Sequence, residues 1–458
     1  MSAAPGSRGR SGWAAYLESL AAFGMRPGLE RVSELLARLG RPQDAYRVVH
    51  IVGTNGKSST TRYCEALLRA HGLRSGAYLS PHISGWTERV LVDGRPVGES
   101  VFGEAVERVR AEVSALPAGV GETTQFEVLT VAALLAFAES GVEAAAVEAG
   151  LGGRLDATNV MEAPVVVLTN IALEHTEVLG DTRELIFAEK AAVIKGGDAV
   201  FGELDGLEPQ ARRACSAAGA APHFLREAPG RGDLAVTGSP DDFAVVFAAE
   251  GETERWAGLR VPTPALYQVT NAALAVAAAR LLLGGLDEAA VRSALASTAV
   301  PGRLQVVGER PLVLADGAHN PDGVRALAQS LSAVDVPRPA VGVLAIMRDK
   351  DYPAMARGFT PLLDAVVCTQ TGEPRSLTAL ELSVAVKEAA TAGMPLPGSP
   401  ARRPHGAPGA PEPAVEIVAD PHAALARARE LAGPGGSVLV GGSLYLLEAL
   451  RDVLAGSL

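Results

Sequence analysis

The sequence predicts an α/β protein made of parallel sheets, with a large first part and a smaller second part. Short continuous apolar runs such as 164–170 are rich in β-branched residues, which is typical of strands buried in a parallel sheet. From residue 312 onward such runs alternate with helical patterns, and this alternation predicts a second, smaller parallel α/β domain. A glycine-bracketed turn also follows the apolar run 48–52, before a helical pattern.

Composition limits the class of protein. The chain has 458 residues, of which 48% are hydrophobic and 20% charged, so it can bury a sizeable core. The formal net charge of -11 disfavours a nucleic-acid partner, because phosphate backbones are bound by a surplus of Lys and Arg. No uninterrupted apolar run reaches the roughly 18 residues of a membrane-spanning helix. Residues 1–12 lack the apolar stretch of a signal peptide, and we expect a disordered tail there.

The three cysteines, Cys64, Cys215 and Cys368, lie far apart and have no paired spacing. This pattern predicts neither a disulfide framework nor a zinc site. A reducing, cytoplasmic location fits it.

The stretch 48–61 predicts a phosphate-binding loop. Gly53 and Gly56 can adopt backbone angles that turn consecutive N–H groups toward an anion, and Lys57 adds a positive charge. Ser58 or Ser59 could reach a magnesium ion, and the following helix would point its N-terminus at the phosphates. The usual P-loop pattern would need glycine where Ile51 stands, so an ordinary strand-to-helix turn stays the alternative.

Polar residues end two further expected strands. Ser80 follows the short run 76–79, where a lone serine is more often structural than functional. Glu148 ends the buried run 144–148, and a carboxylate beside a phosphate loop is a candidate magnesium ligand. The alternative at 149–159 is a glycine-rich turn in which Arg154 and Asp156 merely pair.

Lys190 lies within the helical pattern 185–194, and spacing alone favours a solvated side chain there. Residues 200–262 are weakly patterned and are expected to hold small antiparallel strands such as 243–247. A long alanine-rich helix is expected from 267 to 283. Val300 to Arg303 has the composition of a domain connection, which predicts domains at 13–300 and 301–458.

The second domain is expected to alternate regularly. Its expected elements are strand 312–315, helix 321–332, strand 341–346, helix 354–363, strand 365–369, helix 377–391, strand 415–418, helix 422–431, strand 437–440 and helix 444–454. Polar strings follow three of these strands, at 316–321, 347–351 and 441–443. Residues 395–413 contain seven prolines and are expected to form a disordered surface loop.

Together and in order, these strings resemble one family, folylpolyglutamate synthase and the bifunctional dihydrofolate synthase, within the Mur ligase superfamily. The strings that carry the resemblance are 50–58, 80–82, 126–127, 148–159, 174–176, 179–180, 189–190, 268–271, 301–303, 316–321 and 349–351. The resemblance implies a P-loop-containing, Mur-ligase-type ATP-binding domain followed by a smaller Rossmann-like glutamate-ligase domain. It also implies an ATP-dependent ligase that joins L-glutamate to a folate or dihydropteroate carboxylate through an acyl phosphate.

The resemblance assigns roles by position. The residues implied to bind ATP are Thr54, Asn55, Gly56, Lys57, Ser58, Ser59, Asn271, Arg303 and Asp316. Ser80, Glu148 and His175 would bind two Mg²⁺ ions. Lys190 occupies the position that carries a CO₂-derived carbamate in the family, which reverses the expectation from spacing and requires a lowered pKa. His319 resembles a residue near glutamate and phosphate, so Lys57, His175, Lys190 and His319 would serve catalysis.

The acceptor is implied to bind in two stretches. The residues of these stretches are Thr124, Gln125, Phe126, Glu127, Leu155 and Asp156, with Phe126 available to pack on a pterin ring. Three positions depart from the family, which commonly has glycine at Ser58, aspartate at Glu174 and histidine at Tyr267. We expect activity to survive these changes.

Several points stay open. The acceptor could be dihydropteroate, a reduced folate, or both, and the resemblance suggests a monomer. A superfamily ligase acting on cell-wall peptides is the alternative enzyme, although it should lack the folate-like strings at 124–127 and 148–159. A nucleotide-dependent switch would use the loop without ligation, but the chain has no Asn-Lys-x-Asp guanine motif. An inactive relative is the third alternative.

Overall fold

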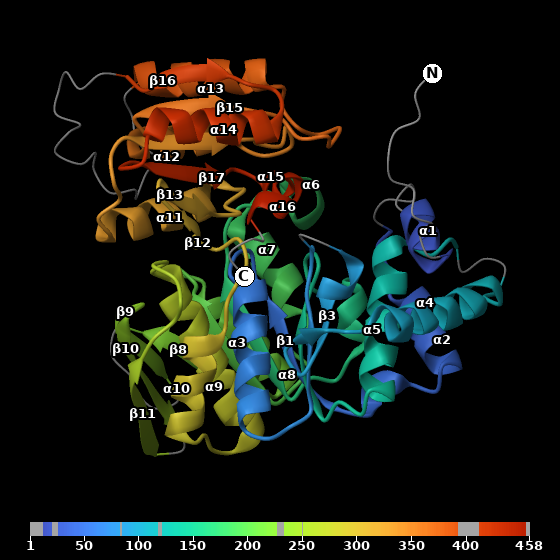
Figure 1. Ribbon diagram of the computed structural model, residues 1–458. Helices are drawn as coiled ribbons and strands as arrows, with labels where there is room; N and C mark the ends of the chain where they lie inside the picture. Colours follow the sequence, from blue (N-terminus) through green and yellow to red (C-terminus); the bar gives the residue numbers. More distant parts are fainter. Residues whose placement is uncertain are drawn as a thin grey trace. The chain divides into compact units, whose positions relative to one another are not determined.

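The structure is a computed structural model that describes residues 12–20, 26–82, 85–117, 121–226, 233–249, 251–392 and 412–454 (Figure 1). The expected tail 1–12 and proline-rich loop 395–413 therefore lie almost wholly outside the described residues. Within the described residues the chain forms two compact units. The first unit runs to Thr237 and adds 244–257 and 271–295, and the second takes 238–243, 258–270 and everything from Ala296.

An eleven-stranded sheet organises the first unit, in the order β11-β10-β9-β8-β7-β6-β1-β5-β2-β3-β4. Its strands are β1 Arg47–Val52, β2 Ser75–Tyr78, β3 Val90–Val92, β4 Arg95–Pro96, β5 Ala144–Glu148, β6 Val165–Asn170, β7 Asp198–Glu203, β8 Ala221–Arg226, β9 Leu234–Ser239, β10 Asp242–Ala249 and β11 Glu252–Leu259. The strands from β9 to β2 pair in parallel, and the β2–β3 and β3–β4 pairs at one end are antiparallel. The expected parallel α/β class is confirmed.

Strand β1 lies between β5 and β6, and this position decides where the polar strand ends meet. Ile51 of β1 is level with Glu148 of β5 on one side and with Val167 of β6 on the other. Because all three strands run in the same direction, the loop after β1, the end of β5 and the end of β6 lie at one edge of the sheet. Ligands bind at this edge in open α/β sheets.

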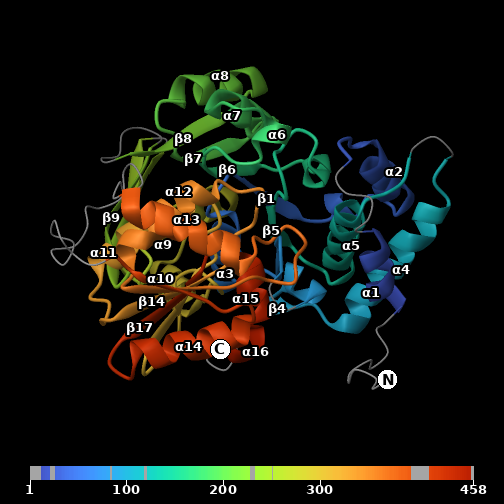
Figure 2. The same ribbon diagram turned by 90° about the horizontal axis from the view of Figure 1, so that it is seen from above.

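Helices surround this sheet and precede the second one. They are α1 Gly12–Ser19, α2 Glu30–Arg38, α3 Lys57–Ala70, α4 Glu99–Ser114, α5 Gln125–Glu139, α6 Thr176–Leu179, α7 Arg183–Ala191, α8 Glu208–Ala218, α9 Tyr267–Leu283 and α10 Glu288–Ser297, with 3₁₀ turns at Pro42–Asp44, Trp86–Arg89 and Ala157–Val160. Helices α1, α2, α4 and α5 pack side by side (Figures 1 and 2). Helix α5 is buried on all sides from Val128 to Phe137, as its uniformly apolar sequence requires.

The second unit contains a six-stranded sheet in the order β12-β13-β17-β14-β15-β16. Its elements are β12 Gln305–Glu309, β13 Leu312–Ala315, α11 Pro321–Ala333, β14 Ala340–Leu344, α12 Tyr352–Phe359, a 3₁₀ turn Thr360–Leu362, β15 Ala365–Cys368, α13 Ala379–Ala392, β16 Ala414–Ile417, α14 Pro421–Ala432, β17 Ser437–Gly441, α15 Leu444–Ala449 and α16 Arg451–Leu454. All pairs are parallel except β12–β13. Helix α14 covers the face opposite α12 and α13 (Figure 2).

Two expectations from the sequence need correction. Strand β12 and helix α10 were not expected, and the weakly patterned stretch 200–262 holds helix α8 and longer strands than expected. Strands β7 and β8 are parallel to β6 instead of antiparallel. The reason is tertiary: Val200 and Phe201 are fully buried because β7 lies inside the sheet, and a short apolar pair cannot reveal that position.

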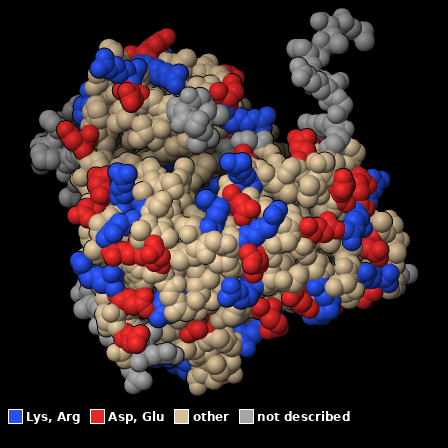
Figure 3. All heavy atoms as spheres, turned by 60° about the horizontal axis from the view of Figure 1, so that its bottom comes forward, with Lys and Arg blue, Asp and Glu red and all other residues tan. Residues whose placement is uncertain are grey.

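No helix among the described residues is long and apolar enough to cross a membrane. On the face drawn in Figure 3, Lys and Arg side chains are interspersed with Asp and Glu and form no continuous basic band among the described residues. This face therefore offers no extended track for a phosphate backbone.

Candidate active site

The turn after β1 has the geometry of an anion-binding loop. Gly53 and Gly56 adopt positive φ angles of 144° and 86°, which side chains rarely permit, and Gly56 is the N-cap of α3. A methyl group at Gly56 would collide with the side chain of Asn271, which therefore lies directly beside the loop. Asn271 is 6% exposed. Helix α3 begins at Lys57, so its free N–H groups point toward the loop.

Two residues of β6 hold this loop, and sequence reasoning gave neither a role. Thr169 donates its hydroxyl hydrogen to the carbonyl of Asn55 at 2.6 Å, and the Asn170 side-chain oxygen accepts the Asn55 N–H at 2.8 Å. The Thr54 hydroxyl donates to the Ala172 carbonyl at 3.2 Å and accepts the Ala172 N–H at 3.1 Å. The parallel pairing of β6 with β1 could have suggested these partners only if the strand order had been known.

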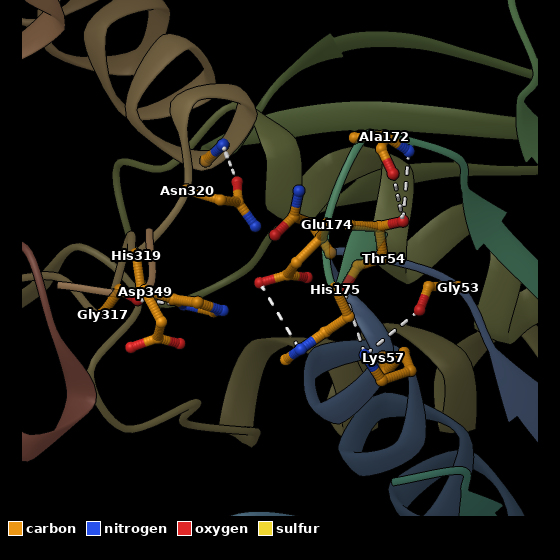
Figure 4. Close-up of polar contacts among 12 residues, drawn as sticks. Gly53, Thr54, Lys57, Ala172, Glu174, His175, Gly317, His319, Asn320 and Asp349 are labelled. Carbon is orange, nitrogen blue, oxygen red and sulfur yellow. Dashed lines mark hydrogen bonds and ion pairs between the residues drawn. The ribbon is translucent and has the colours of Figure 1, made fainter. Parts of the chain in front are cut away.

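Two lysines converge on one backbone carbonyl. The Lys190 amine donates to the Gly53 carbonyl at 2.8 Å, and the Lys57 amine donates to the same oxygen at 3.2 Å and to the Thr54 carbonyl at 3.0 Å. Figure 4 shows Lys57 folded back onto this turn. Lys190 is only 4% exposed, so the solvated side chain that spacing favoured is wrong. Lys190 lies in the last turn of helix α7, and its side chain is directed toward the protein interior, where it reaches the Gly53 carbonyl.

The electrostatics at Lys190 follow from that position. Burial, and then the positive charge of Lys57, lowers the pKa of Lys190 to about 7, against opposing effects of Glu174 and Asp156. An ordinary lysine has a pKa of 10.5. A substantial fraction of Lys190 is therefore neutral near pH 7.

The carboxylate of Glu148 lies beside the first turn of α3. Ser58 donates its hydroxyl hydrogen to Glu148 at 3.0 Å, and Glu148 is 1% exposed. The hydroxyl of Ser59 is also buried and has no hydrogen-bond partner among the described residues. A buried, unpartnered hydroxyl in the first turn of α3, one residue after the Ser58–Glu148 contact and close to the anion loop in sequence, fits a magnesium ion that takes its other ligands from phosphate and water. The described residues contain no cluster of three His, Cys, Asp or Glu side chains that could hold a metal ion.

The remaining expected metal ligands lie on neighbouring loops. Ser80 is partly buried just after β2, at the same sheet edge as Glu148. His175 adopts a left-handed φ of 51° at the start of α6, and its ring nitrogen lies 4.0 Å from the Glu174 carboxylate (Figure 4). Non-glycine residues with such angles are uncommon and cluster at functional sites.

The expected acceptor-binding stretch at the start of α5 is rigid. Thr124 accepts the Glu127 N–H, and the Glu127 carboxylate accepts the Thr124 N–H at 2.7 Å, which forms a capping box. Glu127 also pairs with Arg31 at 2.8 Å, with both side chains almost completely buried. Gln125 donates to the Leu17 carbonyl at 2.7 Å. Sequence reasoning missed Arg31, because a single arginine in a helical pattern does not reveal which carboxylate it will pair with.

The glycine-rich stretch after β5 meets this helix. A methyl group at Gly150 would collide with the Phe126 ring, so the Phe126 ring lies against the loop backbone. Leu155 is 48% exposed and Asp156 is 5% exposed. Arg154 pairs with Glu189 at 3.0 Å, whereas Asp156 accepts hydrogen bonds from Thr158, so the alternative in which Arg154 and Asp156 pair is wrong.

The other expected site residues belong to the second unit. Asp316 is buried, accepts the Ala318 N–H and the Leu304 N–H at 2.8 Å, and accepts the Tyr267 hydroxyl at 2.6 Å. Burial raises the pKa of Asp316, although the charge of Arg303 opposes this effect. His319 donates its Nδ1 hydrogen to the Gly317 carbonyl at 2.8 Å (Figure 4).

Two family models match the chain. Residues 51–279 match the Mur ligase middle domain, and residues 302–444 match the Mur ligase glutamate ligase domain. Together with the parallel sheet and the loop at Gly53–Lys57, these matches define a Mur ligase, an enzyme that forms carbon–nitrogen bonds.

Comparison with individual proteins identifies the family within the Mur ligases to which the chain belongs. The chain is 36% identical to the dihydrofolate synthase/folylpolyglutamate synthase of Mycobacterium tuberculosis, over 79% of this chain and 78% of that one. Escherichia coli FolC in complex with DHPP and ADP is similar in structure, with a TM-score of 0.82, 30% identity and 97% of each chain covered. A bifunctional folylpolyglutamate synthase/dihydrofolate synthase with Mn, AMPPNP and L-glutamate bound has a TM-score of 0.80 at 30% identity, covering 97% of this chain and 98% of that one. The chain belongs to the folylpolyglutamate synthase/dihydrofolate synthase family.

Proposed function

We propose that this enzyme joins L-glutamate to the carboxylate of a dihydropteroate or folate acceptor at the cost of one ATP. A carboxylate oxygen of the acceptor attacks the γ-phosphorus, ADP leaves, and an acyl phosphate forms. The amino group of L-glutamate then attacks the acyl carbon, phosphate leaves with the carbon–oxygen bond's electron pair, and the nitrogen loses a proton. The product is an amide that is one glutamate longer.

The loop supplies what the first step needs. Negative charge grows on the phosphoryl oxygens in transfer, so fixed donors stabilise it. The N–H groups at the start of α3 and the Lys57 amine are these donors, and Asn271 lies against Gly56 at the same loop. Lys57 now donates to two loop carbonyls, and we propose that it exchanges them for phosphate oxygens when ATP binds.

Divalent metal is supported by the donor set in this unit. Ser59, Ser80 and Glu148 are the residues we assign to a first Mg²⁺ ion, and His175 to a second. Such ions, when bound, neutralise phosphate charge and fix the oxygens in line. The Lys190 amine, with its lowered pKa, supports a carbamate formed with CO₂ at this position.

The observation that carries the proposal is the convergence of Lys57 and Lys190 on the Gly53 carbonyl. An ordinary phosphate loop needs one lysine. Simple nucleotide binding does not require a second, buried lysine with a pKa of about 7. A ligase of this kind does require a group that contacts the metal ions and the acyl phosphate, and a carbamate on Lys190 would be such a group.

The test is glutamate-dependent phosphate release with Mg-ATP, run separately with dihydropteroate and with tetrahydrofolate. Lys57→Ala should reduce phosphate release by at least about a hundredfold, because it removes a positive charge that stabilises the negative charge developing on the phosphoryl oxygens in the transition state. Lys387→Ala, which removes an exposed lysine of α13, is the matched control and should keep full activity. Release with one acceptor or with both identifies the enzyme as monofunctional or bifunctional. Release with neither acceptor above the Lys57→Ala background would refute the proposal in favour of a peptide ligase or an inactive relative.

Four further expectations stay predictions. We propose domains at 13–300 and 301–458, with Arg303, Asp316 and His319 of the second domain serving ATP and glutamate. Thr124, Gln125, Phe126, Glu127, Leu155 and Asp156 are assigned to the acceptor. A monomeric state and a cytoplasmic location complete the proposal.

A further inference from the structure

A buried histidine in the central strand has no part in the reaction described above. His50 lies in β1, is 1% exposed, and places its Nε2 atom 2.8 Å from the hydroxyl oxygen of Thr158. Thr158 lies in the 3₁₀ turn that follows the glycine-rich loop after β5. A polar side chain this deep in a sheet needs a hydrogen-bond partner, and this one reaches across to a different segment.

The direction of each hydrogen bond can be assigned. The Thr158 hydroxyl donates its only hydrogen to the Asp156 carboxylate, at 2.5 Å, so its oxygen must accept from His50. His50 is therefore the neutral tautomer with its hydrogen on Nε2. Burial, and then the positive charge of Lys195, lowers the pKa of His50 to about 3, so the ring stays neutral throughout the physiological range.

Asp156 transmits this contact to the loop. The carboxylate oxygen that accepts from the Thr158 hydroxyl also accepts the Thr158 N–H at 3.0 Å, and the other oxygen accepts the Leu151 N–H at 2.8 Å. The Gly150 N–H is a fourth donor to this carboxylate, so all of its roughly four acceptor positions are used within the chain. The carboxylate thus connects the beginning of the loop, at Gly150 and Leu151, to its end, and Gly150 lies against the Phe126 ring.

We propose that His50 is a positioning residue for acceptor binding, acting through Thr158 and Asp156 to fix the loop 150–156 against Phe126. The inference rests on the proposed function, because this loop and Phe126 are where the pterin ring of dihydropteroate or folate is assigned. Asp156 then serves mainly to shape the loop that the acceptor would contact. His50 itself touches no substrate.

Two variants separate positioning from general damage. His50→Leu removes the donor and leaves the Thr158 oxygen without it, which should weaken acceptor binding about tenfold. His50→Gln can place a side-chain N–H near the position of Nε2 and should recover most of the lost acceptor affinity. His50 precedes the phosphate loop by three residues in the same strand, so damage to β1 would weaken ADP binding as well.

Binding of dihydropteroate and of ADP to each variant is measured by calorimetry on the full chain. KM and kcat are measured for dihydropteroate and for ATP. Weaker acceptor binding in His50→Leu, with the ADP dissociation constant within twofold of wild type and rescue by His50→Gln, is the expected result. Equal weakening of both ligands, or no rescue, would overturn the inference. If His50→Leu does not fold, Thr158→Val and its matched control Thr158→Ser carry the same comparison.

Amide hydrogen exchange provides a readout that needs no ligand. Peptides covering 149–160 should exchange faster in His50→Leu than in wild type, while peptides covering 53–57 should not change. This result is expected even if the wild-type enzyme uses neither acceptor, so failure of the proposed function can be told apart from failure of the loop linkage. Unchanged exchange at 149–160 would refute the linkage.

Discussion

Replacing Lys190 by arginine, or removing CO₂ from the buffer, is expected to reduce ligation strongly without unfolding the enzyme. Arginine keeps a positive charge and a long arm but cannot lose its proton and react with CO₂. The protonated lysine first loses one proton to become the neutral amine, whose nitrogen then bonds to the carbon of CO₂ with release of a second proton. The two steps together convert a cation into a carbamate anion. Both perturbations therefore remove the same negatively charged group.

The size of the effect follows from the buried position of Lys190. A lysine with the ordinary pKa of 10.5 is neutral in about 0.03% of molecules at pH 7, whereas a pKa of about 7 makes about half of them neutral. Burial beside Lys57 thus increases the reactive form about a thousandfold. Because the neutral form increases as the pH rises through 7, the initial rate of carbamate formation at fixed dissolved CO₂ should increase about tenfold from pH 6 to pH 8.

The assay combines phosphate release in CO₂-scrubbed and bicarbonate-supplemented buffer with carbon-13 NMR of enzyme incubated with labelled bicarbonate. A carbamate resonance should be present in wild type and absent in Lys190→Arg. Activity of the scrubbed enzyme should return when bicarbonate is added. Full activity in scrubbed buffer, together with a fully active Lys190→Arg enzyme, would refute the reasoning.

Two other predictions follow from hydrogen bonds near the site. Ser58→Gly restores the residue common in the family but removes the donor to Glu148, and because such contacts orient metal ligands it should weaken Mn²⁺ binding about tenfold in a paramagnetic titration. Arg31→Met leaves the buried Glu127 carboxylate without its ionic partner and should lower the free energy of unfolding by about 3–5 kcal/mol, measured by denaturant titration.

Matched variants control both measurements. Ser58→Thr keeps a hydroxyl and should bind Mn²⁺ as wild type does; if Ser58→Gly does so too, the hydrogen bond to Glu148 has no role in metal affinity. Arg38→Met breaks the exposed pair with Glu34 and should change stability by less than about 1 kcal/mol. Equal losses in Arg31→Met and Arg38→Met would contradict the importance of burial.

Much of the fold could be predicted because its signals are local. The strand 144–148 and the helix 267–283 have the expected bounds, and the second unit follows the expected alternation to within a few residues. These elements have continuous apolar runs or clear helical periods. Strands β7 and β12 have weak local patterns, and their neighbours in the sheet hold them in place.

The residues of the candidate site also separate into those that local sequence patterns predicted and those that only the tertiary structure revealed. The sequence by itself determined the glycine-bracketed turn after β1, the carboxylate at the end of β5 and the family, because glycines, a lysine and a glutamate at fixed spacings carry that information. Only the tertiary structure decided that Lys190 is buried on the Gly53 carbonyl, that Arg31 pairs with Glu127, and that His50 reaches Thr158. These contacts join segments about a hundred residues apart. The contacts of Lys190 and His50 start from β1 and the loop after it, and β1 lies between β5 and β6, which no local pattern encodes.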